Sequence, residues 1–303
     1  MKETVRSIIQ GAINRAPWGV RNAILDACIK KFGMNEILNR ALADLRITEI
    51  GANGDMDIIR SSWNDRQILL TYARTGVAES AIVEEISAFF GDSEGTYIDV
   101  GANIGLTTIP IAKKHKVRCI AFEPDPMNFK YLQLNVIQNL PEISVDMKQM
   151  ALFDRRSILQ LALSDGNLGD HRITFSGIEG RRMVGVPAVP LDDIVPEVSG
   201  RLAIKVDTQG AEPFVIAGGR KVFAHAQLVA LEFCPYLMRI MGGDPAVVLD
   251  LLSGFDDIAL LPPGSDAAPS FVKPSDALQK LEHKIRDAKD TDGDYLDVLA
   301  RRT

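Results

Sequence analysis

The sequence has few cysteines and no long apolar run, and both shortages narrow the classes of protein to which it can belong. Its three cysteines, Cys28, Cys119 and Cys234, are far apart and form no CxxC pair. Their number and spacing argue against a disulfide framework or a zinc knuckle and are typical of a reducing compartment. Cys119 and Cys234 lie in apolar runs, so we expect them to be small buried hydrophobic residues.

Neither a membrane span nor a secretory leader is expected. The sequence lacks the stretch of about 18 uninterrupted apolar residues that a transmembrane helix would need. Residues 1–18 contain no apolar block long enough for a signal peptide. We therefore expect a cytoplasmic protein.

A surplus of positive charge is also missing. The 34 lysine and arginine residues are outnumbered by 40 aspartate and glutamate residues, which gives a net charge of −6. Binding of a nucleic-acid backbone depends on an excess of cations, so we expect no nucleic-acid partner. The hydrophobic content of 46% and the charged content of 24% are those of an ordinary globular protein.

The chain begins with an N-terminal extension, which we assign to residues 1–90. Over residues 1–44, apolar residues three and four positions apart indicate helices, which would form a cap or the contact of a homodimer. Two short alternating runs over residues 45–60 flank Asn53-Gly54, and this pattern predicts a β-hairpin.

A helical stretch over residues 80–90 leads into the main domain, residues 91–303, where apolar strands alternate with helical segments. This order predicts a parallel sheet covered by helices on both faces. The stretches 155–190 and 262–292 carry no clear pattern, and we expect loops there that shape a substrate pocket. The strands are expected at 96–100, 117–122, 143–152, 201–207 and 227–233, with a closing pair at 256–261 and 295–300.

The first of these strands runs into a glycine loop and a helix, in the sequence YIDVGANIGLTT. Ligands of open α/β sheets bind beyond the carboxyl ends of the strands, and Gly101 and Gly105 would let a ligand approach the backbone there. A dinucleotide-binding loop has the pattern GxGxxG and would place its middle glycine where Asn103 stands. Asp99 before the loop suits a cationic ligand better than a pyrophosphate, and S-adenosylmethionine carries an ammonium and a sulfonium.

Glu123 stands at the tip of the second strand, 24 residues after Asp99. A carboxylate at this place can accept hydrogen bonds from both hydroxyls of a ribose. Sites for NAD and for S-adenosylmethionine both use such an acid, so Glu123 predicts an adenosine ligand. An NAD-dependent oxidoreductase therefore stays open as an alternative.

Four residues are candidates for chemistry beside this loop. Asp207 ends the fourth strand and Glu232 lies near the end of the fifth, while Lys205 shares one strand face with Asp207. His171, in a polar glycine-rich stretch, is the side chain best suited to accept a proton near neutral pH. Asp207 with Glu232 would permit a divalent metal without requiring one. A purely structural role stays open for each of the four. Asp207 would cap a helix, Glu232 and Lys205 would form ion pairs, and His171 would be a loop residue without a function.

Further polar residues near His171 could bind the hydroxyls of a sugar: Asn167, Asp170 and Arg172. The remaining histidines have no such setting, and we expect them at the surface: His115, His225 and His283.

Five motifs in this order resemble FkbM-type methyltransferases, over about residues 60–260. They are YIDVGANIGLTT at 97–108, AFEPDPMNF at 121–129, ALFD at 151–154, IKVDTQGAE at 204–212 and VALEF at 229–233. The resemblance implies a three-layer, Rossmann-like class I methyltransferase fold, with a mostly parallel seven-stranded sheet and an antiparallel C-terminal strand. It also implies S-adenosylmethionine as methyl donor and a hydroxyl of a sugar, a glycan or a secondary metabolite as acceptor.

The resemblance also implies which residues hold the cofactor. The methionine end would be held by Asp99, Gly101, Ala102, Asn103, Gly105 and Thr107, the ribose by Glu123 and Pro124, and the adenine by Ala151 and Leu152. The commoner family form IDVEGAE has a glutamate where this chain has Gln209, which puts metal binding at that position in doubt. A noncatalytic methyltransferase-like binding protein is the third interpretation.

Overall fold

The computed structural model describes residues 49–52, 57–62, 65, 68, 80–140, 145–195, 197–263, 265, 267–288, 291 and 293–302. The helices predicted over residues 1–44, the homodimer contact assigned to them, Cys28 and the turn at Asn53-Gly54 lie outside these residues.

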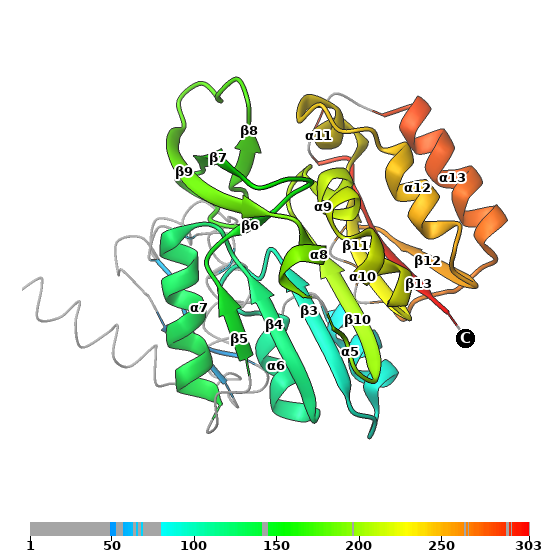
Figure 1. Cartoon of the computed structure of the whole chain (residues 1–303), viewed down its shortest axis with the longest axis horizontal. Coiled ribbons are helices and arrows are strands. Elements are labelled where there is room, and N and C mark those ends of the chain that lie inside the picture. Colours follow the sequence, from blue (N-terminus) through cyan, green and yellow to red (C-terminus); the bar gives the residue numbers. More distant parts are fainter. Residues whose placement is uncertain are drawn as a thin grey trace, which may run out of the picture.

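A seven-stranded sheet forms the centre of the fold, in the order β12-β13-β11-β10-β3-β4-β5 (Figure 1). Its strands are parallel except β13, which runs antiparallel to both of its neighbours. The predicted class I methyltransferase fold and the closing pair are thus confirmed. The bounds are β3 Gly95–Val100, β4 Val117–Phe122, β5 Val145–Lys148, β10 Arg201–Val206, β11 Leu228–Phe233, β12 Asp257–Leu261 and β13 Leu296–Arg301.

Helices cover both faces of this sheet because its strands are apolar on both sides. On β3, Tyr97 packs with the helices of one face, whereas Ile98 and Val100 pack with those of the other. The first face carries α5 Ser80–Phe90, α6 Thr108–Lys114 and α7 Pro126–Asn139. The second carries α8 Leu191–Ile194, α9 Glu212–Gly218, α10 Arg220–His225, α11 Pro235–Ile240, α12 Ala246–Leu252 and α13 Pro274–Arg286.

The chain leaves β3 toward β4 and β5 in one direction and returns through β10 to β11 in the other. The reversal places the switch point between β3 and β10, where open α/β sheets bind their ligands. The predicted glycine loop after β3 therefore lies where a cofactor would bind.

The expected loop over residues 155–190 is wrong in part, because half of this stretch forms strands of a second sheet with the order β6-β9-β7-β8. The strand predicted over residues 143–152 is split between the sheets, into β5 and the short β6. Gly185 and Pro187 lie inside β9, and both residue types are depleted in strands, which weakened the sequence signal. The bounds are β6 Ala151–Leu152, β7 Ser157–Leu163, β8 Arg172–Thr174 and β9 Arg182–Val189.

The expected loop over residues 262–292 is also wrong in part, because α13 occupies 13 of its residues. Pro274 lies in the first turn of α13, where its missing N–H costs no helical hydrogen bond and its fixed φ favours the helix. The proline that suggested a loop therefore begins a helix.

The predicted hairpin is present as the antiparallel pair β1 Glu49–Ala52 and β2 Asp57–Arg60. Two asparagines one turn apart on α7 hold the edge of β2. The Asn135 amide accepts from the Arg60 N–H and donates to the Arg60 carbonyl, and Asn139 does the same with Ile58. These side chains replace the neighbouring strand that β2 lacks on this edge.

Burial tests the predictions for the remaining cysteines and histidines. Cys119 and Cys234 are buried, as expected. His225 and His283 are exposed as expected, but His115 is half-buried. Its ring nitrogens lie 2.8 Å from the Ser87 hydroxyl and 2.8 Å from the Gly91 carbonyl, and so join the ends of α5 and α6. None of the helices in the described part of the chain is long and apolar enough to cross a membrane.

Gly101 lies where the loops after β3 and β10 approach most closely. Its φ is +79°, and a Cβ atom there would lie 1.9 Å from the carbonyl oxygen of Asp207. The Asp207 N–H donates to the Val100 carbonyl at 3.0 Å, which fixes the two loops against each other. Glycine is required at this position by both conformation and space.

We expect Gly101→Ala to destabilise the protein far more than Gly177→Ala. Gly177 has φ +80° with nothing within 4 Å of its added Cβ, so alanine there carries only the left-handed penalty, about 1 kcal/mol. The clash at Gly101 adds roughly 2 kcal/mol or more. Urea unfolding of both variants measures the difference, and equal losses would contradict the close approach.

Candidate active site

A cavity of about 220 Å³ lies at the carboxyl ends of β3, β4 and β10, between the two sheets. Most of the predicted site residues line it: Gly101, Ala102, Asn103, Thr107, Glu123, Pro124, Ala151, Leu152, His171, Lys205 and Asp207. Asp99, Gly105 and Glu232 are not among the lining residues. Residues from distant parts of the chain thus meet at one place.

Asp99 lies behind the cavity wall, with its side chain fully buried. One carboxylate oxygen accepts 2.6 Å hydrogen bonds from the Thr107 and Thr108 hydroxyls, and the other lies 3.8 Å from Lys205 Nζ. Lys205 is opposite Asp99 in the β3–β10 register. The carboxylate thus acts on the cavity through Thr107 and Lys205, which do line it, rather than by facing it.

Glu123 lies directly after β4 and is 5% exposed. Its two carboxyl oxygens accept from the Asn103 N–H at 2.9 Å and from the Asp125 N–H at 2.8 Å. Burial raises the pKa of Glu123 to about 8, against the lowering effect of these two hydrogen bonds. The carboxyl is fixed in place and retains lone pairs for further donors.

The second sheet supplies the wall opposite the glycine loop. Ala151 and Leu152 form β6, which pairs with β9, and both are buried. Leu161 of β7 and Ile173 of β8 line the same wall. This wall is apolar and would suit the flat face of an adenine, in keeping with the expected place of Ala151 and Leu152.

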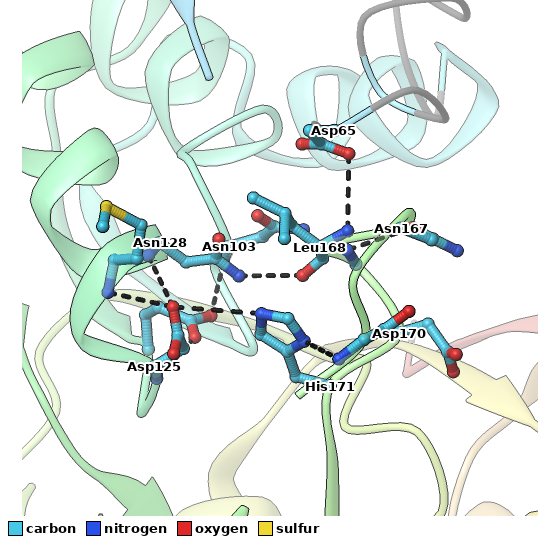
Figure 2. Close-up of polar contacts among 12 residues, drawn as sticks. Asp65, Asn103, Asp125, Asn128, Asn167, Leu168, Asp170 and His171 are labelled. Carbon is cyan, nitrogen blue, oxygen red and sulfur yellow. Dashed lines mark hydrogen bonds and ion pairs between the residues drawn. The ribbon is translucent and has the colours of Figure 1, made fainter. Parts of the chain in front are cut away.

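Residues 164–171, which we name the roof, connect β7 to β8, and Leu168, Gly169 and His171 among them line the cavity. Figure 2 shows the polar contacts of Leu168 and His171. The Leu168 carbonyl accepts from Asn128 Nδ2 at 2.8 Å, and the Leu168 N–H donates to Asp65 at 3.4 Å. His171 Nε2 lies 3.9 Å from the carboxylate of Asp125, the N-cap of α7. The roof is held by α7 and by the N-terminal extension together.

A backbone hydrogen bond to the His171 ring fixes the tautomer of the neutral imidazole. Its Nδ1 accepts from the Ser164 N–H at 3.0 Å, so the neutral ring carries its proton on Nε2. Burial lowers the pKa of His171, although the carboxylates of Asp125 and Asp170 raise it. Nδ1 is thus occupied by the Ser164 N–H, and Nε2 lies 3.9 Å from the Asp125 carboxylate, which is too far for a hydrogen bond but close enough for an ion pair when the ring is charged.

The three polar residues expected to bind a sugar, Asn167, Asp170 and Arg172, have partners within the protein. The Asp170 carboxylate pairs with Arg172 and Arg181, and the Asn167 side chain accepts from the Gly169 N–H. These contacts stiffen the turn that carries the roof.

Asp207, Gln209 and Glu232 form a connected group at the carboxyl ends of β10 and β11. Gln209 Nε2 lies 2.9 Å from Asp207 Oδ1 and 3.2 Å from Glu232 Oε1, so one amide donates to both acids. The other oxygen of Asp207 lies 3.7 Å from Lys205 Nζ. Burial raises the pKa of Glu232 well above its usual range, and Asp207 raises it further. Asp207 alone of the two acids lines the cavity.

Glu212 holds the turn that presents Gln209. Its carboxyl accepts from the Thr208 N–H and hydroxyl and from the Gly210 N–H. Burial raises the pKa of Glu212 to about 7. Gln209 has φ +54°, a left-handed conformation that is strained for residues other than glycine. Glu212 therefore has a structural task at the site.

No group of three or more histidine, cysteine, aspartate or glutamate side chains in the described part of the chain is arranged to hold a metal ion. Asp207 and Glu232, the predicted metal candidates, are bridged by the Gln209 amide.

Several cavity residues were not among the predicted site residues. Asn128 belongs to the quoted AFEPDPMNF motif, and Met150 directly precedes the predicted Ala151. The sequence therefore carried a usable signal for both residues. Ile68, Leu161, Leu168 and Ile173 reach the cavity only through the second sheet, its roof and the extension. No local pattern marks them.

A model of the methyltransferase FkbM domain matches residues 99–253, which is just over half of the chain. The protein belongs to the FkbM methyltransferase family. It is therefore a methyltransferase that depends on S-adenosylmethionine, which excludes the NAD-dependent alternative.

Solved structures similar to this FkbM methyltransferase include other methyltransferases. An rRNA methylase from Streptococcus thermophilus has 14% identity and a TM-score of 0.38, over 73% of this chain and 95% of its own. Magnesium protoporphyrin IX methyltransferase from Synechocystis PCC 6803, with bound SAM, has 11% identity and a TM-score of 0.38, over 73% and 76%. No curated protein matches the sequence significantly. The family assignment therefore rests on the domain match.

The cavity of this FkbM methyltransferase fits the chemistry of its cofactor. Glu123 can accept from ribose hydroxyls, and the Asn103 side-chain oxygen is a buried acceptor without a hydrogen-bond partner among the described residues. An ammonium or a hydroxyl of the ligand would satisfy that oxygen. Gly101 and Gly105 have φ values of +79° and +95°, left-handed conformations in which the loop can turn sharply beside the cavity.

We expect binding of 5′-methylthioadenosine, which lacks the titrating ammonium of the full cofactor, to strengthen with pH. The pKa of Glu123 in the free protein is about 8, and the ribose hydroxyls favour its ionised form. Below pH 8 binding must expel a proton, so Kd should fall up to about tenfold per pH unit from pH 6 to 8 and then level off. Calorimetry measures this. The slope should vanish in Glu123→Gln, and a slope that survives there would assign it to another group.

Proposed function

We propose that this FkbM-family protein transfers a methyl group from S-adenosylmethionine to a hydroxyl of a sugar, a glycan or a secondary metabolite. The observation that carries the proposal is the Asp207 carboxylate, which faces the cavity while both of its oxygens are oriented, one by Gln209 and one toward Lys205. A hydroxyl acceptor must lose a proton, and a fixed carboxylate at the acceptor side can take it.

The cofactor supplies an already activated methyl group on its sulfonium, so the protein mainly has to align the acceptor oxygen. Lys205, 4% exposed and within 4 Å of Asp99 and Asp207, would steady the negative charge that develops as the hydroxyl loses its proton. Asp207 would accept that proton. Glu232 supports Asp207 through Gln209, and His171 holds the roof in place.

Asp207→Asn should lower methyl transfer by about 10²–10⁴-fold, the usual contribution of a general base, while cofactor binding is retained. The assay uses a methyl-labelled donor with a panel of sugars, glycosides and phenolic metabolites. Asp250→Asn is the matched control, because Asp250 is an exposed acid on α12 and lies outside the cavity.

Three other results would contradict the proposal in different ways. Labelled product on nitrogen or carbon would place the methyl transfer elsewhere than on oxygen. Cofactor binding without product on any hydroxylated acceptor would favour the noncatalytic interpretation. Full activity of Asp207→Asn would remove Asp207 as the base.

Two wider assignments remain proposals. A cytoplasmic location is supported by the small number and wide spacing of the cysteines, Cys28, Cys119 and Cys234. A boundary near residue 90 between the extension and the main domain would describe sequence regions rather than separate cores, since α5 shares the hydrophobic cluster of α6 and α7.

A further inference from the structure

Asn128 carries an unsatisfied hydrogen-bond acceptor at the cavity. The residue is 2% exposed and lines the cavity, and its side-chain oxygen is buried without a hydrogen-bond partner among the described residues. A buried acceptor left unpaired is unfavourable, so a partner is expected when the site is in use.

The orientation of the Asn128 amide is fixed by its other end. Asn128 Nδ2 donates to the Leu168 carbonyl of the roof at 2.8 Å, and an oxygen in its place could not donate this bond (Figure 2). The side-chain oxygen therefore is the end left for a ligand. It can only accept, so the ligand group must carry an O–H or N–H.

The position of Asn128 associates it with the nucleoside half of the ligand. The Glu123 carboxyl accepts from the Asp125 N–H at 2.8 Å, and the Asp125 carboxylate accepts from the Asn128 N–H at 2.8 Å. These two bonds join the predicted ribose acid to Asn128 across the start of α7. Glu123, Asp125 and the Asn128 oxygen are all acceptors, which suits a group that brings two donors and repels a phosphate.

We propose that Asn128 is a cofactor-binding residue whose side-chain oxygen accepts a hydrogen bond from a ribose hydroxyl, beside Glu123. Because the same amide holds the Leu168 carbonyl, it links the occupied ribose site to the closed roof. The inference rests on the cofactor half of the proposed function and is independent of the acceptor.

The test compares the affinities of wild-type and variant proteins for a set of related ligands, measured by calorimetry. The ligands are 5′-methylthioadenosine, its 2′-deoxy and 3′-deoxy forms, and its analogue without the adenine 6-amino group. Asn128→Ala should weaken binding of 5′-methylthioadenosine about tenfold, and it should cost little for the deoxy ligand that lacks the hydroxyl in question. Asn139→Ala, on the same helix but directed to Ile58, should leave all four affinities unchanged.

A second variant separates the two ends of the amide. Asn128→Asp keeps an acceptor and loses the donor to Leu168, so the dependence on the ribose hydroxyl should persist. Hydrogen exchange over residues 164–171 should rise in both variants, and the ligand should slow it in wild type more than in Asn128→Ala.

The outcomes are distinct. Unchanged affinity of a folded Asn128→Ala, an equal loss for all four ligands, or coupling to the adenine amino group would each overturn the inference while the proposed function stands. Wild-type protein that binds neither 5′-methylthioadenosine nor S-adenosylmethionine would overturn the cofactor half of the proposed function and this inference with it.

Discussion

The contact between the loops after β3 and β10 is the constraint on which the site depends. The Asp207 N–H donates to the Val100 carbonyl, and the Asp207 carbonyl lies where a Gly101 side chain would begin. This contact brings the two halves of the sheet together at the switch point. It sets the glycine loop after β3 on one side of the cavity and Asp207 on the other.

Buried acids surround that contact, and each is held by N–H donors. Glu123 accepts from Asn103 and Asp125, and Glu212 accepts from Thr208 and Gly210. Burial raises the pKa of both, to about 8 and about 7, because removal from water disfavours the charged form. Of the two, only Glu123 lines the cavity, so only its charged form would be stabilised further by donors of a ligand.

Helix α7 organises the surroundings of the cavity through asparagines on one face. Asn128 holds the roof, while Asn135 donates to both the Ile104 carbonyl of the cofactor loop and the Arg60 carbonyl of β2. Positions 128, 135 and 139 recur at spacings of seven and four residues and so share one side of the helix. The extension, the cofactor loop and the roof are therefore fixed to one rigid element.

The sequence by itself determined the main sheet, the glycine loop, Glu123 and Asp207, because each is written in short local patterns of strand, turn and helix. It also placed Lys205 and Asp207 on one strand face. The tertiary structure alone decided that Asp99 lies behind the wall, that the Ser164 N–H occupies Nδ1 of His171, that Gln209 bridges Asp207 and Glu232, and that half of the stretch 155–190 belongs to a second sheet. Hydrogen-bond partners and burial come from residues far apart in the chain, and no local period records them.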